Sequence, residues 1–492
     1  MIEHFPAIQV ALPMIAAAVI VIVKHPLYCH LIATGVAWIS AVIAWTMLQT
    51  VLTSGPISYQ LGGWAPPTGI EYYIDPLNAF VLFLVSGIAA VVFPFAERSV
   101  AAEVDERKHH LFYACLLLCL TGMLGITITG DAFNIFVFLE ITSLSSYALI
   151  AMGRDRRALS ASFNYLVLGT LGGTAILIGV GLLLMQTGTL NIADLHMRLE
   201  GAQATSKTVL VALAFLTVGS SLKIALFPLH AWLPNAYAHA PSAVTALIAA
   251  TSTKVSLYVL IRFIFTLFGT AVVFDVFQLQ RVLLPLAVVG MFVGSLVAIY
   301  QTNIKRMLAY SSLAQIGYMV LGISLVNESG LAGSIVHMFN HAVIKGGLFM
   351  VMAAVVLRTG SAELSAMRGL AKRMPLTYLG FVIGGLGLIG VPLTAGFVSK
   401  WYLVLGAIDK GMWVIVALIL LSSLLAVIYV WRVVEVGFFE EPDPDAPEVT
   451  EAPLSMLIPT WIMLGASLFF GITTDTTAGV ALEAARQLLG AP

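Results

Sequence analysis

Charged residues are scarce in this chain, and their scarcity excludes most soluble folds. Only 10% of the 492 residues are Asp, Glu, Lys or Arg, whereas 60% are hydrophobic. An ordinary soluble domain carries about 25% charged residues. The formal net charge is -1 and no Lys/Arg-rich block occurs, so the sequence lacks the electrostatic footprint of a nucleic-acid-binding protein. We therefore expect a lipid bilayer, and not nucleic acid, around this chain.

Cysteine and cofactor motifs are also rare. The three cysteines, Cys29, Cys115 and Cys119, form no CxxC or zinc-binding pattern. The segment 385–390 matches GxGxxG by letter, but it lies in an apolar run with no preceding strand and no acidic residue at the expected distance. The sequence therefore predicts neither a metal ion nor a bound cofactor, and any redox chemistry would belong to partners.

Apolar runs of about 20 residues are abundant, and each is long enough to cross roughly 30 Å of hydrocarbon as a helix. The first run lacks a basic segment before it and a cleavage site after it, so we interpret it as a retained span. The predicted fold class is an all-α polytopic membrane protein of about fourteen transmembrane helices. The predicted spans are 7–23, 28–50, 76–96, 110–129, 131–151, 160–185, 208–238, 242–266, 282–301, 306–325, 330–357, 375–405, 411–436 and 453–472.

Two segments between the spans have a distinct composition. Residues 55–75 contain two alternating, β-prone stretches separated by glycine and proline, which predicts a hairpin on the membrane surface. Residues 440–453 are rich in Glu, Asp and Pro, which predicts a solvated loop.

The distribution of basic residues predicts the orientation in the membrane, because lysine and arginine accumulate in cytoplasmic loops. Of the 24 basic residues, fourteen, among them Lys305, are assigned to loops after odd-numbered spans, five to the other loops and five to the spans. We therefore expect a multi-pass protein of the cell membrane with both termini outside.

Proline interrupts two of the longer spans. The seventh span contains Pro228 and Pro234, and the twelfth contains Pro392. Each proline removes a backbone donor and clashes with the preceding turn, so both helices should be broken. Because five spans separate the breaks, the pattern indicates two inverted five-helix repeats. The expected divisions are 1–109 for helices 1–3 with the hairpin 55–75, 110–266 for the first repeat, 282–436 for the second, and 437–492 for the acidic loop and helix 14.

Several ionisable residues lie within the predicted spans, where a charge costs about 2.5 to 3.5 kcal/mol near the bilayer centre. Such residues usually mark ion pathways. Histidine exchanges protons near neutral pH, and a buried carboxylate beside a lysine forms a pair that can gain or release a proton when it separates. The candidate proton pathway consists of Glu140, Lys223, Lys254, His337, His341 and Lys400, with His230 and Lys345 as further candidates.

Structural alternatives exist for some of these residues. Glu140 and Lys223 could form a static ion pair between helices. His230 could satisfy backbone groups that the break beside Pro228 leaves free. Lys254 and Lys400 have no obvious carboxylate within a span, so a purely static role is harder to sustain for them.

Three other charged residues lie near span ends. Asp75 and Asp131 begin spans, where a carboxylate complements the helix N-terminus, so we predict capping roles for both. Arg262 is predicted to extend its side chain toward the membrane surface.

Five sequence stretches resemble the antiporter-like subunits shared by Mrp-type multisubunit sodium/proton antiporters and respiratory complex I. They are DAFNIFVFLE (131–140), KIALFPLHAWLP (223–234), APSAVTALIAA (240–250), KRMLAYSSLAQIGY (305–318) and HMFNHAVIK (337–345). The resemblance covers roughly residues 75–435. It implies a fourteen-helix fold, an outside N-terminus and assembly with several other membrane subunits.

The resemblance also implies roles for individual residues. Glu140 resembles the family's fifth-helix glutamate, Lys223 its seventh-helix lysine and Lys254 its eighth-helix relay lysine. His337 and His341 resemble the eleventh-helix histidines. Lys400 resembles the terminal group of the twelfth helix, where a lysine is similar to the Mrp D type and to some complex I subunits, while another complex I branch has glutamate. The chain length and the lack of a long C-terminal lateral helix favour the Mrp D type.

Three functional hypotheses follow. The leading one is a proton-translocating subunit of a multisubunit antiporter that exchanges H+ for a monovalent cation, with Na+ implied by the resemblance. The main alternative is a proton-pumping membrane subunit of a complex I-like NADH:quinone oxidoreductase or a membrane-bound hydrogenase. A membrane scaffold for a cytoplasmic enzyme partner is the third.

Overall fold

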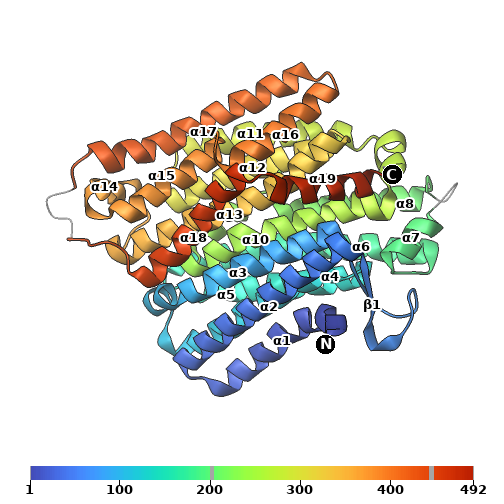
Figure 1. Cartoon of the computed structure of the whole chain (residues 1–492), viewed down its shortest axis with the longest axis horizontal. Helices are drawn as coiled ribbons and strands as arrows, with labels where there is room; N and C mark the ends of the chain where they lie inside the picture. Colours follow the sequence, from blue (N-terminus) through green and yellow to red (C-terminus); the bar gives the residue numbers. More distant parts are fainter. Residues whose placement is uncertain (1, 200–203, 443–447, 491–492) are drawn as a thin grey trace.

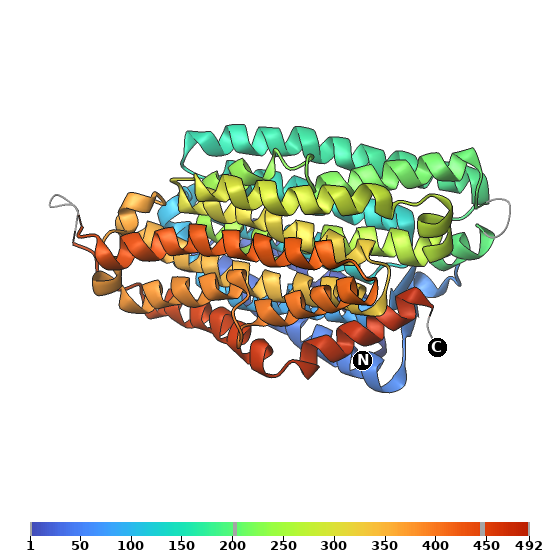
Figure 2. The ribbon, with the colours of Figure 1, turned by 90° about the horizontal axis from the view of Figure 1, so that it is seen from above.

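The apolar runs form long helices because only a helix satisfies every backbone N–H and C=O within one segment in lipid. The computed structural model describes residues 2–199, 204–442 and 448–490, and its helices lie along one common axis (Figures 1 and 2). The long helices are α1 (Phe5–Val23), α2 (Pro26–Ser54), α3 (Pro76–Glu103), α4 (His109–Ile128), α5 (Ala132–Ala151), α6 (Arg156–Thr187), α8 (Lys207–Ile224), α10 (Ser242–Ile261), α11 (Gln280–Ile299), α12 (Ile304–Ser324), α13 (Glu328–Thr359), α15 (Pro375–Ile389), α16 (Ala395–Asp409), α17 (Trp413–Phe439), α18 (Leu454–Ile472) and α19 (Asp475–Leu489).

Short elements connect the long helices. They are the α-helical α7 (Ile192–Arg198), α9 (Leu233–His239) and α14 (Leu370–Arg373), the 3-10 helices η1 (Ile2–His4), η2 (Leu61–Gly63), η3 (Glu106–Lys108) and η7 (Leu364–Met367), and the π-helical η5 (Arg262–Phe268) and η6 (Ala271–Val276).

The number of membrane crossings agrees with the sequence. In the described part of the chain, thirteen helices are long and apolar enough to cross a membrane. The broken pair α15 and α16, which occupies the predicted twelfth span, supplies the fourteenth crossing. The prediction of an all-α polytopic fold of about fourteen helices is therefore confirmed.

Both predicted breaks are present. The seventh span divides into α8 and α9, and Ala225 after α8 adopts the left-handed conformation with φ of 60°. The twelfth span divides into α15 and α16, where Gly390 and Leu393 have φ of 86° and 75°. At each break the carbonyls of the preceding helical turn lose their usual partners, so they are free to accept bonds from side chains.

The predicted surface hairpin is also formed. Strand β1 (Ile57–Gln60) pairs antiparallel with β2 (Glu71–Ile74), with Ile57 opposite Ile74. The hairpin lies at the same end of the bundle as α7 and the C-terminus (Figure 1). We call this the hairpin end, and we call the opposite end the Asp155 end.

Two features near the C-terminus differ from the sequence prediction. The final helix, α19, was not predicted, because the charged and polar residues of its outer face keep its hydropathy below that of a membrane span. Ala478, Ala481 and Ala485 are buried where it packs on α13 and α3. The acidic segment 440–453 is only partly a free loop. Residues 443–447 lie outside the described residues, but Glu451 accepts hydrogen bonds from the Leu376 amide at 2.7 Å and the Thr377 hydroxyl at 2.5 Å, and so caps α15.

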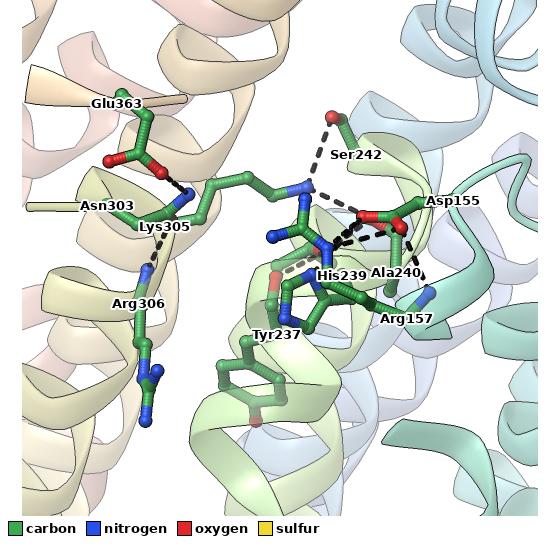
Figure 3. A network of polar contacts seen from close by, with 11 residues as sticks. Asp155, Arg157, Tyr237, His239, Ala240, Ser242, Asn303, Lys305, Arg306 and Glu363 are labelled. Carbon is green, nitrogen blue, oxygen red and sulfur yellow. Dashed lines mark hydrogen bonds and ion pairs between the residues drawn. The ribbon is translucent and has the colours of Figure 1, made fainter. Parts of the chain in front are cut away.

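A polar network joins four segments at the Asp155 end (Figure 3). Lys305 was assigned to a loop from the sequence, and that assignment was wrong: it lies in the first turn of α12 and is only 4% exposed. Its Nζ donates to the Ala240 carbonyl at 2.9 Å and to the Ser242 hydroxyl at 3.3 Å. A lysine of the second predicted repeat thus binds the junction between α9 and α10 of the first.

Two carboxylates complete this network. Glu103 at the end of α3 accepts bonds from the Ser242 amide and hydroxyl, both at 3.0 Å, and so caps α10 from outside. Asp155 lies 3.4 Å from the His239 ring and 3.0 Å from the Arg157 guanidinium. Partial burial acts to raise the pKa of Asp155, but the Arg157 amide and guanidinium and the His239 ring together hold it below its usual value.

We expect Glu103→Ala to destabilise the protein, because it removes the cap of α10 and a carboxylate of the Lys305 network. Loss of a helix cap alone costs about 1 kcal/mol. The melting temperature of the purified protein in detergent should fall. Glu106→Ala, which removes an exposed carboxylate from the neighbouring η3, is the matched control. Equal melting temperatures for the two variants would contradict this role of Glu103.

Candidate functional site

A buried ion pair joins α5 and α8. Lys223 Nζ lies 3.1 Å from Glu140 Oε1 and donates to the Ser143 hydroxyl at 2.8 Å. The Lys223 side chain is 4% exposed and that of Glu140 is 24% exposed, so the pair is accessible only from the carboxylate side. The Glu140 carboxylate fits against Gly173 of α6, where a Cβ atom would come within 2.1 Å of Oε1.

The helix break explains the position of Lys223. This lysine lies in the last turn of α8, which ends at Ile224. A cation near a helix C-terminus is stabilised by the helix dipole. Lys223 therefore has two sources of stabilisation, the helix end and the Glu140 carboxylate.

Lys254 occupies the middle of α10, and no acidic residue of the described ranges forms an ion pair with it. It is 1% exposed, and its Nζ donates to the Ala249 carbonyl at 2.5 Å and to the Thr253 hydroxyl at 3.3 Å. Helix α10 packs against both α8 and α13. Lys254 therefore lies on the helix between the Glu140–Lys223 pair and the histidines.

Three predicted residues share one face of α13. His337 is hydrogen-bonded through Nδ1 to Ser399 and through Nε2 to Gln315, both at 2.8 Å. The His341 ring is stacked on that of His337 with centroids 6.0 Å apart, and neither of its ring nitrogens has a hydrogen-bond partner in the described part of the protein. Lys345 donates to the Leu308 carbonyl at 2.7 Å and to the Ser311 hydroxyl.

Lys400 lies at the second break. Its Nζ donates to the carbonyls of Leu388 and Ile389 at the end of α15, at 3.2 and 2.8 Å, and to the Ser423 hydroxyl at 2.9 Å. The ammonium group also lies 4.9 Å from the centre of the Tyr318 ring, a cation–π distance. Like Lys223, Lys400 lies beside a helix break, but its ammonium group bonds the carbonyls that end the preceding half-helix, whereas that of Lys223 bonds Glu140 and Ser143.

The last candidate, His230, lies in the break between α8 and α9. Its ring stacks on Phe227 at a centroid distance of 5.5 Å and faces the edge of Tyr310 at 6.5 Å. No side-chain hydrogen bond within the described ranges joins it to the other candidates, so the structure brings His230 to the break but not into the row.

The structure thus forms two groups of candidate residues, Glu140 with Lys223 and the α13 histidines with Lys400, and Lys254 lies on the helix between them. Glu140 and Lys223 are in direct contact, and His337 connects to Lys400 through Ser399, the residue before Lys400. In the described ranges, no ion pair includes Lys254, Lys345 or Lys400.

Sequence reasoning did not single out the neutral residues that hold these groups. Ser143, Gln315, Ser399 and Ser423 each bond directly to a charged or histidine side chain of the row. The only sequence signal lies in spacing: Ser143 is three residues after Glu140, on the same helix face, and Ser399 precedes Lys400.

Comparison with known proteins places this chain in a family. Residues 129–426 match the family described as NADH:quinone oxidoreductase/Mrp antiporter, TM. The chain is 41% identical over 482 residues to the N-type subunit of the NADH-quinone oxidoreductase of Desulforudis audaxviator, covering 94% of both chains. It is 32% identical over 490 residues to the D-type subunit of the Na(+)/H(+) antiporter of Bacillus subtilis, covering 99% of this chain and 97% of that protein.

Solved structures agree with the sequence comparisons. A chain of the Mrp complex from Dietzia sp. DQ12-45-1b superposes with a TM-score of 0.91 and 26% identity, covering 99% of this chain and 97% of the other. A chain of the membrane-bound sulfane sulfur reductase, an archaeal respiratory membrane complex, gives a TM-score of 0.89 and 32% identity, with 98% and 97% covered. The chain is therefore an antiporter-like membrane subunit and belongs to the NADH:quinone oxidoreductase/Mrp antiporter family.

Proposed function

We propose that this chain is the proton-translocating subunit of a multisubunit antiporter that exchanges H+ for a monovalent cation, with Na+ as the leading candidate. It acts as a secondary transporter subunit with no catalytic residue of its own, in the cell membrane and with both termini outside. The carrying observation is the set of three buried lysines, Lys254, Lys345 and Lys400, that are held by carbonyls and hydroxyls and, within the described residues, by no carboxylate.

Energetics favour proton exchange over a static role at these lysines. A buried ammonium group without a counter-ion costs several kcal/mol, and release of its proton removes that cost. A static structural role would be served better by an apolar residue of similar size. The proposed order is therefore Glu140, Lys223, Lys254, His341 with His337 and Lys345, and then Lys400.

Water completes the proposed path. Lys254 makes no direct bond to Lys223 or to the histidines, and water-mediated hydrogen bonds can bridge such gaps at little energetic cost. His341 offers two ring nitrogens with no partner in the described structure, so it can receive a proton from either side of the row.

We expect Glu140→Ala, Lys223→Ala and Lys254→Ala each to abolish proton-coupled transport while leaving folded protein in the membrane. The measurement is the decay of a pH gradient in membrane vesicles that contain the assembled complex, with the amount of protein determined in parallel. Lys207→Ala, at the exposed start of α8, is the control. Wild-type exchange by the three row variants would refute the relay.

The packing of Glu140 on α6 supplies a test that changes no charge. Gly173→Ala places a Cβ atom within 2.1 Å of the present position of Glu140 Oε1, so the carboxylate must leave its present position beside Lys223. We expect transport at least tenfold slower, or a shifted pH profile. Gly181→Ala on the same helix meets no atom within 4 Å and should behave as wild type. Equal rates for both variants would show that the carboxylate position does not matter.

The second candidate function is that of a proton-pumping membrane subunit in a redox complex of the NADH:quinone oxidoreductase or hydrogenase type. The 41% identity to an N-type subunit of an NADH-quinone oxidoreductase favours it, as does the likeness to a chain of the sulfane sulfur reductase complex. In that case partner subunits would hold the redox cofactors.

Sodium dependence distinguishes the two candidates. The test uses vesicles that contain the assembled complex and carry an imposed pH gradient. We expect NaCl to collapse the gradient, and we expect choline chloride to leave it intact over the same period. The Lys254→Ala complex should not respond to either salt. If the gradient ignores sodium and proton movement instead requires an electron donor such as NADH, the redox assignment replaces the antiporter.

A further inference from the structure

A second buried ion pair closes the hairpin end of α10, away from the row described above. Arg262 was predicted to extend toward the membrane surface, and this prediction was wrong: the side chain is 6% exposed. Its Nη2 donates to Asp75 Oδ1 at 2.5 Å and to Asn78 Oδ1. Asp75 also accepts a hydrogen bond from the backbone N–H of Asn78 at 3.0 Å. It therefore has the predicted capping role in α3 and an additional role as counter-ion of Arg262.

The other two guanidinium nitrogens of Arg262 also donate hydrogen bonds. Nε donates to the Tyr258 hydroxyl at 3.1 Å and Nη1 to the Thr266 hydroxyl at 3.2 Å. Arg262 begins the π-helical segment that ends α10, and such wide turns are frequent at functional sites. A guanidinium with four side-chain partners from two parts of the chain is a plug rather than a mobile surface group.

Two cavities meet at this plug. One has a volume of about 410 Å³ and the other of about 300 Å³, and Tyr73, His196, Arg262 and Thr266 line both. Each is large enough for several water molecules. The larger cavity is also lined by Glu71, whose carboxylate is held by Ser58 at 2.5 Å and by Asn191 at 3.0 Å.

Tyr258 and Asn78 form the inner wall of the larger cavity. The side-chain amide of Asn78 donates to the Tyr258 hydroxyl at 2.8 Å. The Thr127 carbonyl accepts from both side chains, from Asn78 at 2.7 Å and from Tyr258 at 3.0 Å. Tyr258 lies four residues after Lys254, and Arg262 lies four residues after Tyr258, so the three share one face of α10. Each step is about 6 Å along the helix axis.

From this placement we infer that Arg262 and Asp75 form a gate between Lys254 and water at the hairpin end, the outer side in the proposed orientation. This inference rests on the proposed relay role of Lys254. With the pair closed, Arg262 and Tyr258 together form the wall that separates the water of the cavity from Lys254. With the pair open, water passes Tyr258 and a proton can move between Lys254 and the outside.

The surroundings allow the pair to separate without leaving either charge unsatisfied. When the pair is open, Asp75 still accepts a hydrogen bond from the backbone N–H of Asn78 and still lies at the N-terminal end of α3. Both interactions stabilise a carboxylate without Arg262. Arg262 can turn toward Glu71 in the wall of the same cavity. The gate therefore exchanges one carboxylate partner for another as it opens.

Thiol accessibility tests the gate independently of transport. In a background with Cys29, Cys115 and Cys119 replaced by serine, Lys254→Cys is exposed to a charged, membrane-impermeant methanethiosulfonate reagent from each side of the membrane. Trp64→Cys in the exposed hairpin identifies the vesicles that present the hairpin side. We expect labelling of Lys254→Cys from that side to become at least tenfold faster when Arg262→Gln is added, and labelling from the other side to stay unchanged.

Controls keep the result decisive. Arg198→Gln, which breaks the Arg198–Asp194 surface pair at the same end, should leave labelling unchanged. If Arg262→Gln leaves Asp75 uncompensated and the protein misfolds, the double variant Asp75→Asn with Arg262→Gln removes both charges and retains a capping side chain. If labelling of Lys254→Cys stays unchanged in the folded Arg262 variant, the gate is refuted. Wild-type transport by Lys254→Ala would instead refute the relay, and the measured accessibility of position 254 would still stand.

Discussion

The structure depends on the need of buried ammonium groups for oxygen acceptors. Lipid offers none, and an uncompensated charge within the membrane costs several kcal/mol. The two helix breaks meet this need. Lys223 lies in the last turn of α8, and Lys400 donates to the carbonyls of Leu388 and Ile389 at the end of α15. The second break frees carbonyls that bond the Lys400 ammonium group, whereas at the first break the ammonium group of Lys223 takes its oxygen acceptors from Glu140 and Ser143. Both breaks therefore bring a lysine to a place where oxygen acceptors are available.

The same constraint separates the row into stronger and weaker positions. Lys223 has a carboxylate at 3.1 Å in addition to its helix end, whereas Lys254 has one carbonyl and one hydroxyl inside an unbroken helix. His337 is fixed by two hydrogen bonds, whereas the stacked His341 has no hydrogen-bond partner for its ring nitrogens in the described structure. A row that alternates firmly held groups with weakly held ones suits stepwise proton transfer, because no single position traps the proton.

The sequence predicted the parts that depend on local chemistry. Proline within a long apolar run indicates a break wherever it occurs, and an ionisable residue in mid-span is costly whatever surrounds it, so both breaks and all six principal candidates could be named. Contacts between distant segments could not be predicted. Asp75 and Arg262 are 187 residues apart, and each has a local interpretation, as a cap and as an interfacial arginine, that gives no hint of the other. Lys305 was misassigned because a lysine at a span end resembles a loop residue until the partner helix supplies its carbonyl.

Burial alone does not distinguish the charges that could move protons from those that hold the fold, and neither do direct hydrogen-bond partners: Lys305, like Lys254, donates to one carbonyl and one hydroxyl. The place of the residue in the fold distinguishes them. Lys305, like the relay lysines, is buried, yet it lies among Ala240, Ser242 and the nearby Glu103 at the tip of the bundle, where it joins the two predicted repeats. Arg262 cannot be deprotonated in a protein, so it can act only by position. A lysine without a carboxylate is different, because losing its proton is the cheapest way to relieve its burial. The absence of a counter-ion among the described residues at Lys254 and Lys400 is therefore the feature that makes a proton path chemically reasonable.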